Sequence, residues 1–255
     1  MAAFIAVPCS FAWGRLGHIT IQTIAMNHLT PQAAATIAKT GGLTPKDSYW
    51  LDTIKDDEPY KTKFEGWHAS IATPDCKSPA NVRLEYRDGK DGVTALKKIK
   101  LEMADYRNLP DSIVHEAVKC IVHIVGDMHC PCHVRYTDNS NSGKFRVVFN
   151  DKETTLHKVW DSELISYMSG YGRKDAAQYA GRLDTWTEEQ IAGVQKGWGQ
   201  EWFEDAARDV RPTVGKVKKG AFLDNMWAKE NIGLAELELQ KAGYRLAAAL
   251  NEIFK

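Results

Sequence analysis

One segment, residues 112–128, constrains the fold of this 255-residue chain more than any other. Between residues 118 and 125 it is apolar on almost every side of a helix, so other elements must surround it. His123 and Asp127 lie on this segment four residues apart, and therefore on one face. Burying an imidazole and a carboxylate without partners costs on the order of several kcal/mol. We therefore expect a central helix whose two polar side chains are satisfied by each other or by a ligand.

The rest of the chain is predicted to be mainly helical. Thr30-Pro31 is typical of a helix start, and Gly41-Gly42 is typical of its end. Helical spacing also predicts helices over residues 96–106, 112–128, 157–169, 174–183, 187–209 and 221–250. Residues 144–149 alternate as a strand does, and Asn150-Asp151 offers a turn after them. No repeat, low-complexity tract or long linker divides the chain, so we expect one mainly α helical domain with a short β-hairpin.

The composition is that of an ordinary globular protein, with 44% hydrophobic and 26% charged residues. The 33 basic and 33 acidic residues cancel, which excludes a protein that coats nucleic acid through bulk positive charge. No apolar run of about 18 residues occurs, so a membrane-spanning helix is excluded as well. A phosphate ligand would have to be held by a local arrangement.

Residues 1–12 (MAAFIAVPCSFA) have the features of a signal peptide. They are apolar and uncharged, and they end in Ser-Phe-Ala, which suits a cleavage site. The basic beginning of a signal peptide is missing, so this one is expected to be truncated or to start at the wrong codon. Cleavage would make Trp13 the first residue of a secreted or periplasmic protein. Lipid attachment at Cys9 is the weaker alternative.

Cysteine usage leaves the redox state open. Four cysteines would remain after cleavage, namely Cys76, Cys120, Cys130 and Cys132. An even number in an exported protein permits two disulfides with three possible pairings, and it is equally compatible with free thiols.

Candidate metal ligands follow the central pair along the chain. His133 comes after Pro131, which should end the helix and turn the chain back toward it. His157 and Asp161 then repeat the spacing of four residues. Each pair alone is as well explained by a hydrogen bond or a helix cap. Together these residues form a credible zinc set, because neutral imidazoles and carboxylates are common zinc ligands.

Three further candidates, His18, Asp52 and His68, lie upstream. Each has tryptophan nearby in the sequence that could shield a site from water, yet each alone is more common as an ordinary structural residue. If cleavage exposes Trp13, its free amino group and carbonyl could chelate a cation close to His18.

The order of these motifs resembles a known family. The motifs are residues 13–18 (WGRLGH), Trp50-x-Asp52, Trp67-His68, residues 122–127 (VHIVGD), Pro131-x-His133 and residues 156–161 (LHKVWD). They follow one another as in the secreted, zinc-dependent single-strand nucleases of the S1/P1 type, which are distantly similar to zinc-dependent phospholipase C. The resemblance runs from Trp13 to the C-terminus and implies the helical fold of that group.

The resemblance implies a trinuclear zinc nuclease domain over residues 13–255. One Zn²⁺ would be held by Asp52, His68, His123 and Asp127. A second would be held by the amino group and carbonyl of Trp13, by His18 and again by Asp127. The third would be held by His133, His157 and Asp161.

The implied reaction is hydrolysis of RNA and single-stranded DNA to 5'-mononucleotides, with removal of 3'-phosphates, by attack of a zinc-bound hydroxide on phosphorus. Asp52, Asp127 and Lys55 are the expected catalytic residues, and Asn139, Asn141 and Gly143 the expected substrate contacts. No stable protein partner is implied. Where the family has Gln-Pro-Leu before the histidine that corresponds to His133, this chain has Cys130-Pro131-Cys132, whose thiolates could compete for metal or enter a disulfide.

Two alternatives remain open from the sequence. A zinc-dependent phospholipase C would share the fold and the metals, although that family usually has glutamate where this chain has Asp161. A secreted zinc-binding protein without catalysis would need no carboxylate shared between two ions.

Overall fold

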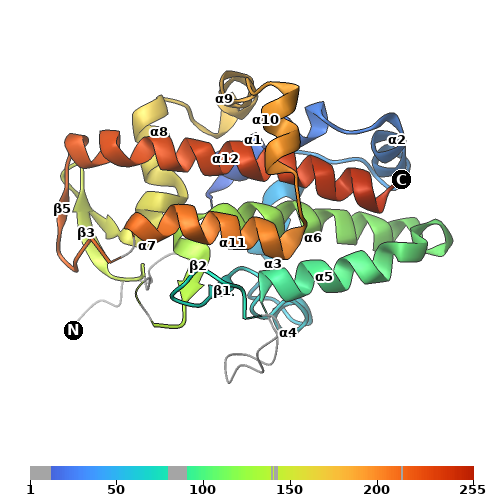
Figure 1. Ribbon diagram of the computed structural model, residues 1–255, viewed down its shortest axis with the longest axis horizontal. Helices are drawn as coiled ribbons and strands as arrows, with labels where there is room; N and C mark the ends of the chain where they lie inside the picture. The colour runs from blue at the N-terminus through green and yellow to red at the C-terminus, as the bar shows by residue number, and fades with distance from the viewer. Residues whose placement is uncertain (1–12, 80–90, 139, 141–142, 214) are drawn as a thin grey trace.

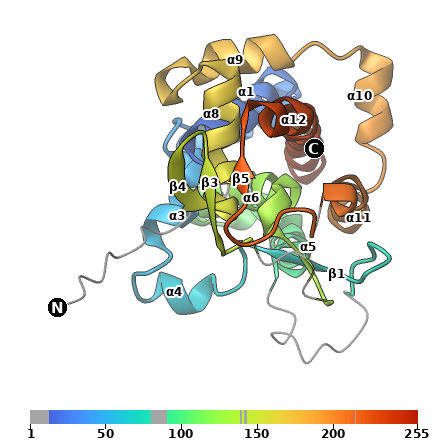
Figure 2. The same cartoon turned by 90° about the vertical axis from the view of Figure 1, so that its left-hand side faces the viewer.

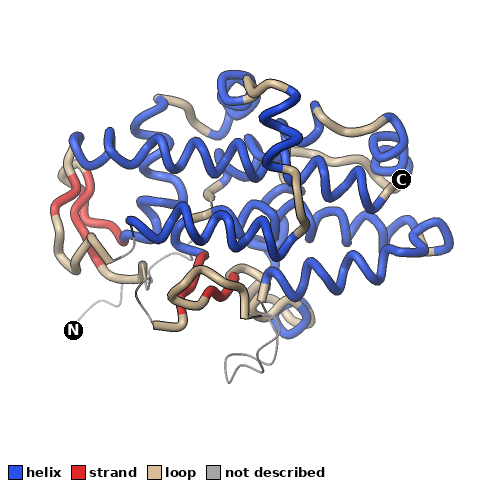
Figure 3. Tube along the Cα trace, viewed as in Figure 1, coloured by secondary structure: helices blue, strands red, loops and turns tan. Residues whose placement is uncertain are grey.

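The computed structural model describes residues 13–79, 91–138, 140, 143–213 and 215–255. In this part of the chain the protein is mainly helical, as predicted, and most of its strands lie at one end (Figures 1 and 3). The helices are α1 (Arg15–Asn27), α2 (Pro31–Lys39), α3 (Trp50–Ile54), α4 (Tyr60–Lys63), α5 (Gly92–Glu102), α6 (Asp111–His129), α7 (Leu156–Lys158), α8 (Leu164–Ser169), α9 (Ala176–Leu183), α10 (Glu188–Val194), α11 (Gly199–Val210) and α12 (Asn225–Ile253). The strands are β1 (Ser70–Ala72), β2 (Val134–Tyr136), β3 (Arg146–Phe149), β4 (Lys152–Thr155) and β5 (Phe222–Leu223). Short 3₁₀ turns are η1 (Asp47–Tyr49), η3 (Met103–Asn108), η4 (Pro131–His133), η6 (Arg173–Asp175) and η7 (Arg211–Thr213), and η5 (Val159–Glu163) is a π-helical turn.

Helix α6 is the central helix that its apolar sequence predicts. It packs against α12 on one side and α5 on the other, and α1 lies beside α12 (Figures 1 and 2). Its residues Val118, Ile121, Val122 and Val125 are fully buried. The position of α6 explains why its sequence is almost entirely apolar over two turns, since nearly every residue of that stretch is shielded from water and only Lys119 is partly exposed.

Two glycines allow the helices around α6 to approach closely. A Cβ at Gly243 of α12 would lie 2.6 Å from a methyl group of Ile24 in α1. A Cβ at Gly126 of α6 would lie 2.9 Å from Nδ1 of His18. Glycine at these positions therefore brings α1 against both long helices and places His18 directly beside α6.

The strands form two small sheets. The predicted hairpin is present as antiparallel β3 and β4, and both residues of its turn, Asn150 and Asp151, have positive φ. Strand β5 adds to β3 in parallel, which local sequence patterns did not predict. In the other sheet β1 pairs in parallel with β2, with Ser70 opposite Val134.

Three helix boundaries differ from the prediction. The helix expected over residues 187–209 is two helices, α10 and α11, because Gly197 adopts a φ of +83° between them. The helix expected from residue 221 begins at Asn225, since Phe222 and Leu223 pair as β5. Helix α5 ends at Glu102, although the predicted apolar face continues through η3 and buries Tyr106.

All four cysteines in the described residues are buried free thiols. The disulfides that the sequence permitted are therefore absent from this part of the structure. The predicted signal peptide, residues 1–12, lies outside the described residues.

Candidate metal centre

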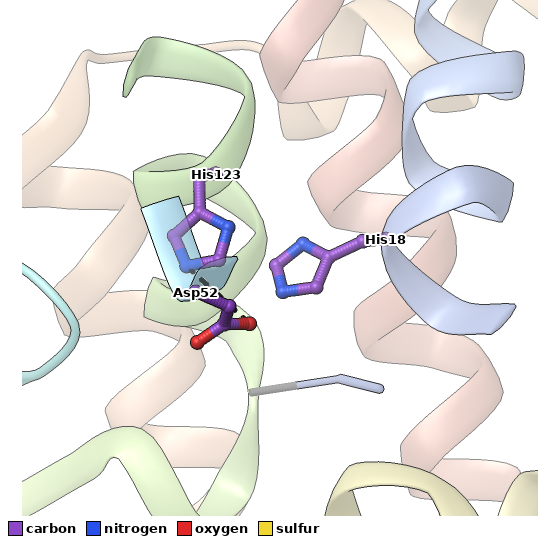
Figure 4. Close-up of side chains that lie close together, drawn as sticks. All are labelled: His18, Asp52 and His123. Carbon is purple, nitrogen blue, oxygen red and sulfur yellow. Dashed lines mark ion pairs between the residues drawn. The ribbon is translucent and has the colours of Figure 1, made fainter. Parts of the chain in front are cut away.

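The candidate ligands come from separate elements and meet on one side of α6. The contributing residues are His18 from α1, Asp52 from α3, His68 just before β1, His123 and Asp127 from α6, His133 from η4, His157 from α7 and Asp161 from η5. Figure 4 shows His18, Asp52 and His123 converging from three helices. Residues up to 143 positions apart in sequence (18 and 161) thus belong to one cluster.

The carboxylate of Asp127 lies at the centre of the cluster. Its Oδ1 is 3.3 Å from Nε2 of His18. Its Oδ2 is 3.2 Å from Nε2 of His123 and 3.3 Å from Nδ1 of His68. The two oxygens therefore face two different sets of nitrogens, which is the arrangement that a carboxylate shared by two cations requires.

Asp52 faces the same histidines from the opposite direction. Its Oδ2 lies 3.9 Å from Nε2 of His123, and its Oδ1 lies 3.8 Å from Nδ1 of His68. Lys55, one turn later, reaches the Oδ1 atom at 3.1 Å. Asp52 is therefore shared between the cluster and a lysine that stands at its edge.

A second group of ligands lies next to the first. Nε2 of His133 is 3.1 Å from Nε2 of His157, which is 3.3 Å from Oδ2 of Asp161. Oδ1 of Asp161 lies 3.9 Å from Nε2 of His133 and 3.4 Å from the sulfur of Cys130. Nδ1 of His133 is 3.7 Å from Asp127, so the two groups are contiguous.

Several buried polar atoms of the cluster have no hydrogen-bond partner within the described residues. These atoms are both ring nitrogens of His18, Oδ2 of Asp52, Nε2 of His68 and both carboxylate oxygens of Asp127. Leaving such groups buried and unsatisfied costs about 1–3 kcal/mol each. Nitrogen and oxygen donors at these separations suit a cation, so the residues present fit the metal ions that the sequence predicts.

The protonation states favour cation binding. Burial would raise the pKa of Asp127, yet His123 and His133 hold it well below its usual value, so the carboxylate is charged. Burial lowers the pKa of His133 to about 3, and burial with Lys144 lowers that of His157 to about 4. Burial also lowers the pKa of His18. Neutral imidazoles and a charged carboxylate are the forms that bind metals.

His123 differs from the other histidines. Burial opposes its protonation, but Asp127 and Asp52 raise its pKa to about 9. Its Nδ1 donates to the carbonyl oxygen of Ser48 at 3.1 Å, which leaves Nε2 directed at the carboxylates. A cation among these carboxylates would replace the proton on Nε2.

Comparison with known proteins identifies the family of this chain. The sequence model of the S1/P1 nuclease family matches residues 13–255. Nuclease P1 of Penicillium citrinum is 29% identical, covering 94% of this chain and 97% of the relative. Nuclease S1 of Aspergillus oryzae is 26% identical (96% and 92%), and Endonuclease 2 of Arabidopsis thaliana is 24% identical (98% and 93%). The chain belongs to the S1/P1 nuclease family. It is therefore a nuclease, a hydrolase that acts on phosphodiester bonds of nucleic acid.

Two local features of this nuclease position its ligands in ways that sequence reasoning missed. His68 and His133 come just before the paired strands β1 and β2, and parallel strands begin at the same edge of a sheet. The Nδ1 of His133 also contacts the carbonyl oxygen of His68. Asp161 lies in the π-helical turn η5, a feature often found at functional sites. The carbonyl of Ser48, a backbone group, left no signal in the sequence.

Trp13 and Gly143 are the remaining predicted site residues that the structure describes. The carbonyl of Trp13 accepts from the backbone N–H of His18 at 3.3 Å, and its indole is fully buried. Gly143 has a φ of +56°, and its carbonyl accepts from the backbone N–H of His157 at 2.8 Å, so it supports that ligand. Asn139 and Asn141 lie outside the described residues. None of the described helices is long and apolar enough to cross a membrane.

Proposed function

We propose that this nuclease hydrolyses RNA and single-stranded DNA to 5'-mononucleotides and removes 3'-phosphates, using three Zn²⁺ ions. The observation that carries the proposal is the central carboxylate of Asp127. One of its oxygens faces His18 and the other faces His68 and His123, and neither has a hydrogen-bond partner among the residues that the structure describes. A buried, charged carboxylate without hydrogen-bond donors is suited to bridge two cations and does not serve as a structural hydrogen-bond acceptor.

We propose the ligand sets that the family resemblance implies. Asp52, His68, His123 and Asp127 would hold one ion; Trp13, through its amino group and carbonyl, with His18 and Asp127 would hold a second; His133, His157 and Asp161 would hold the third. Zinc takes nitrogen and oxygen ligands of these kinds. When bound, such ions supply Lewis acidity toward phosphate oxygens and lower the pKa of water.

The protein's own residues orient the site. The hydrogen bond from Nδ1 of His123 to Ser48 selects the tautomer that offers Nε2, and the contact of His133 Nδ1 with the His68 carbonyl does the same for His133. Such partners orient the ligands and make them more basic.

Positive charge explains how a protein of zero net charge binds a polyanion. Three divalent cations and the carboxylates of Asp52, Asp127 and Asp161 leave a local charge of about +3. Arg135 and Lys144 both lower the pKa of His157, so these cationic side chains lie near the third ion's ligands. We assign Lys55, which reaches Asp52 at the edge of the cluster, to phosphate binding as a point charge.

Burial of the ligands supports the preference for single strands. His18, His123, Asp127 and Asp161 are each at most 1% exposed. A scissile phosphate can approach such a site only where the bases are free to leave their stack, which costs little in single strands. Asn139, Asn141 and Gly143 remain our proposed contacts with the substrate.

The site also bears on processing of the chain. We propose that residues 1–12 are removed as a signal peptide, that residues 13–255 form the mature domain, and that the enzyme is secreted or periplasmic. Cleavage would convert the backbone nitrogen of Trp13 into an amine, five positions before His18. Only then could this residue act as a bidentate ligand.

The central experiment combines metal analysis with an activity panel. Purified protein that begins at Trp13 is assayed on single-stranded DNA, RNA, 3'-AMP and phosphatidylcholine, before and after chelation and after zinc is restored. We expect about three zinc ions per chain and zinc-dependent release of nucleotides and phosphate. Hydrolysis of phosphatidylcholine without nucleotide release would replace the proposal with a phospholipase C. Zinc binding without any hydrolysis would leave only a storage role.

A variant with one added alanine before Trp13 tests the role of the amino terminus. It should lose one zinc ion of the three, because its chain lacks a free amine at Trp13, while the other two sites stay filled. Metal content by mass spectrometry decides the matter. Full retention of three ions would show that the amine of Trp13 is not a ligand.

A further inference from the structure

Cys130 occupies a position between two of the candidate ligands. It is the residue at which α6 ends, and its N–H donates to the carbonyl of Asp127 at 3.0 Å. Its own carbonyl accepts from the N–H of His133 at 2.9 Å. The same turn therefore sets the positions of Asp127, Cys130 and His133, and the cysteine cannot move independently of the ligands on either side.

The sulfur of Cys130 faces the ligand atoms of the third site. It is completely buried and lies 3.4 Å from Oδ1 of Asp161. The sulfur of Cys130 and ligand atoms of His133 and Asp161 all lie within 4.8 Å of one another. Ligand atoms about 2.0–2.3 Å from a tetrahedral zinc ion are separated from each other by roughly 3.3–3.8 Å. Oδ1 of Asp161 lies 3.4 Å from the sulfur and 3.9 Å from Nε2 of His133, which is close to that range.

We propose that Cys130 is a sulfur ligand of the metal ion held by His133, His157 and Asp161. The proposal rests on the metal dependence proposed above and goes beyond it. With Cys130 this ion would have four protein ligands, the number found in structural zinc sites. The site would also favour thiophilic cations such as Zn²⁺, Cd²⁺ and Co²⁺ over Mg²⁺.

The surroundings of the thiol explain why it would bind a cation. The sulfur donates to Oδ1 of Asp161 at 3.4 Å, so the thiol proton lies between two of the proposed ligand atoms. Metal binding breaks the S–H bond, forms a metal–sulfur bond and releases one proton to solvent. The two charges of a divalent ion then balance those of the thiolate and of Asp161.

Cys132 provides a matched control in the same turn. It is also a buried thiol, two residues further along, but its sulfur contacts the carbonyl of Leu156 at 3.8 Å. It does not belong to the group of ligand atoms formed by Cys130, His133 and Asp161. Replacing either cysteine by serine removes one sulfur from the same region, so only the coordinating one should change the metal's spectrum.

The test uses cobalt in place of zinc. Metal-free protein beginning at Trp13 is loaded with Co²⁺, its metal content is measured, and near-ultraviolet spectra are recorded for the wild type, Cys130→Ser and Cys132→Ser. We expect a sulfur-to-cobalt charge-transfer band in the wild type and in Cys132→Ser, and its loss in Cys130→Ser. The Cys130→Ser variant should also hold the third metal at least about tenfold more weakly in competition with a chelator.

The wild-type spectrum alone can overturn the proposal, even if the variant folds poorly. Full loading with cobalt and no charge-transfer band would make Cys130 only a hydrogen-bond donor to Asp161. A band that remains in Cys130→Ser and is lost in Cys132→Ser would show that Cys132, and not Cys130, supplies the sulfur ligand. Failure to bind any cobalt or zinc would instead refute the proposed metal dependence, so the two failures are distinguishable.

Discussion

Two buried carboxyl groups of this nuclease have opposite properties. Asp127 of α6 and Glu238 of α12 are both almost completely shielded from water, and neither has a hydrogen bond to its carboxylate oxygens within the described residues. The pKa of Asp127 lies well below its usual value, whereas burial raises the pKa of Glu238 well above its own. Burial alone therefore does not determine the charge of a carboxyl group.

The neighbours of each group account for the difference. Nitrogens of His18, His68 and His123 lie 3.2–3.3 Å from Asp127. The ammonium group of Lys241 lies 3.7 Å from Glu238, and the carboxylate of Asp209 opposes it by raising the pKa of Glu238. That ammonium group is already engaged by Asp205, at 2.7 Å, and by Asp209.

The comparison distinguishes a carboxylate that is suited to bind a cation from a carboxyl group that only fills space in the core. Glu238 remains neutral and part of the core, whereas Asp127 stays charged among imidazole nitrogens, of which Nε2 of His18 has no hydrogen-bond partner within the described residues. Only the second arrangement gains by admitting a cation, because the cation satisfies the carboxylate and the imidazoles together.

Two histidines of α6 show the same contrast. His129 donates from Nδ1 to the carbonyl of Val125 at 2.8 Å, and its Nε2 accepts from Arg245 at 3.0 Å. Burial and Arg245 lower its pKa to about 3, so it is a neutral and fully partnered residue. His123, six residues earlier, keeps Nε2 for the cluster. A histidine next to the metal site is thus not a ligand if another side chain satisfies it.

Replacing Asp127 by a neutral residue tests the difference between the two carboxyl groups most directly. We expect Asp127→Asn to lower nuclease activity by more than about a thousandfold, since loss of even one preorganised electrostatic group costs about 10²–10³. It should also lose more than one zinc ion, because the carboxylate faces two sites. Metal analysis and assays on single-stranded DNA measure both effects, with Glu238→Gln as the control that retains both. Full activity in Asp127→Asn would refute the bridging role.

Removal of the metal tests whether the cluster needs cations for stability. Each ion present at 100 times its Kd contributes about 2.7 kcal/mol to the folded state. Chelation should therefore lower the thermal midpoint of the wild type markedly, and that of Asp127→Asn much less. Calorimetry with and without chelator gives the difference. Equal shifts in both proteins would mean that the chelator acts on something other than this cluster.

Lys55 tests the edge of the cluster. We expect Lys55→Ala to lower kcat/KM on single-stranded DNA by about 10–100-fold, the value of one charge-assisted hydrogen bond. Lys55→Arg should restore most of the rate, and Lys61→Ala, on the exposed surface of α4, should have no effect. A rate unchanged in Lys55→Ala would make this lysine only a partner of Asp52.

Glu238 should give the smallest effect, and one that depends on pH. Because its pKa is raised in the folded state, its contribution to stability is fully present below the unfolded value of about 4.3 and is lost as pH rises through the folded pKa. Glu238→Gln should match the stability of the wild type near pH 4 and exceed it at pH 9. Urea unfolding at the two pH values measures this. A wild type that gains stability relative to the variant as pH rises would reverse the assigned sign.

Much of the fold could be predicted from local patterns. The apolar run over residues 118–125 predicted the central helix, and Thr30 does cap α2, since its hydroxyl accepts from the N–H of Ala33. The break at Gly197 could not be predicted, because an isolated glycine is often tolerated inside a helix. Strand β5 was missed because two residues carry too little pattern and depend on pairing with β3.

The sequence by itself determines which side chains are available as metal ligands. Helical spacing places His123 beside Asp127, because residues four apart share a helix face. Tertiary packing decided which oxygen of Asp127 faces His18 and placed the sulfur of Cys130 beside Asp161. It also left the carboxyl group of Glu238 without a hydrogen-bond partner among the described residues. The reason is physical: spacing along a helix is set by local backbone geometry, whereas contacts between distant segments depend on how α1, α6 and α12 bury their surfaces together.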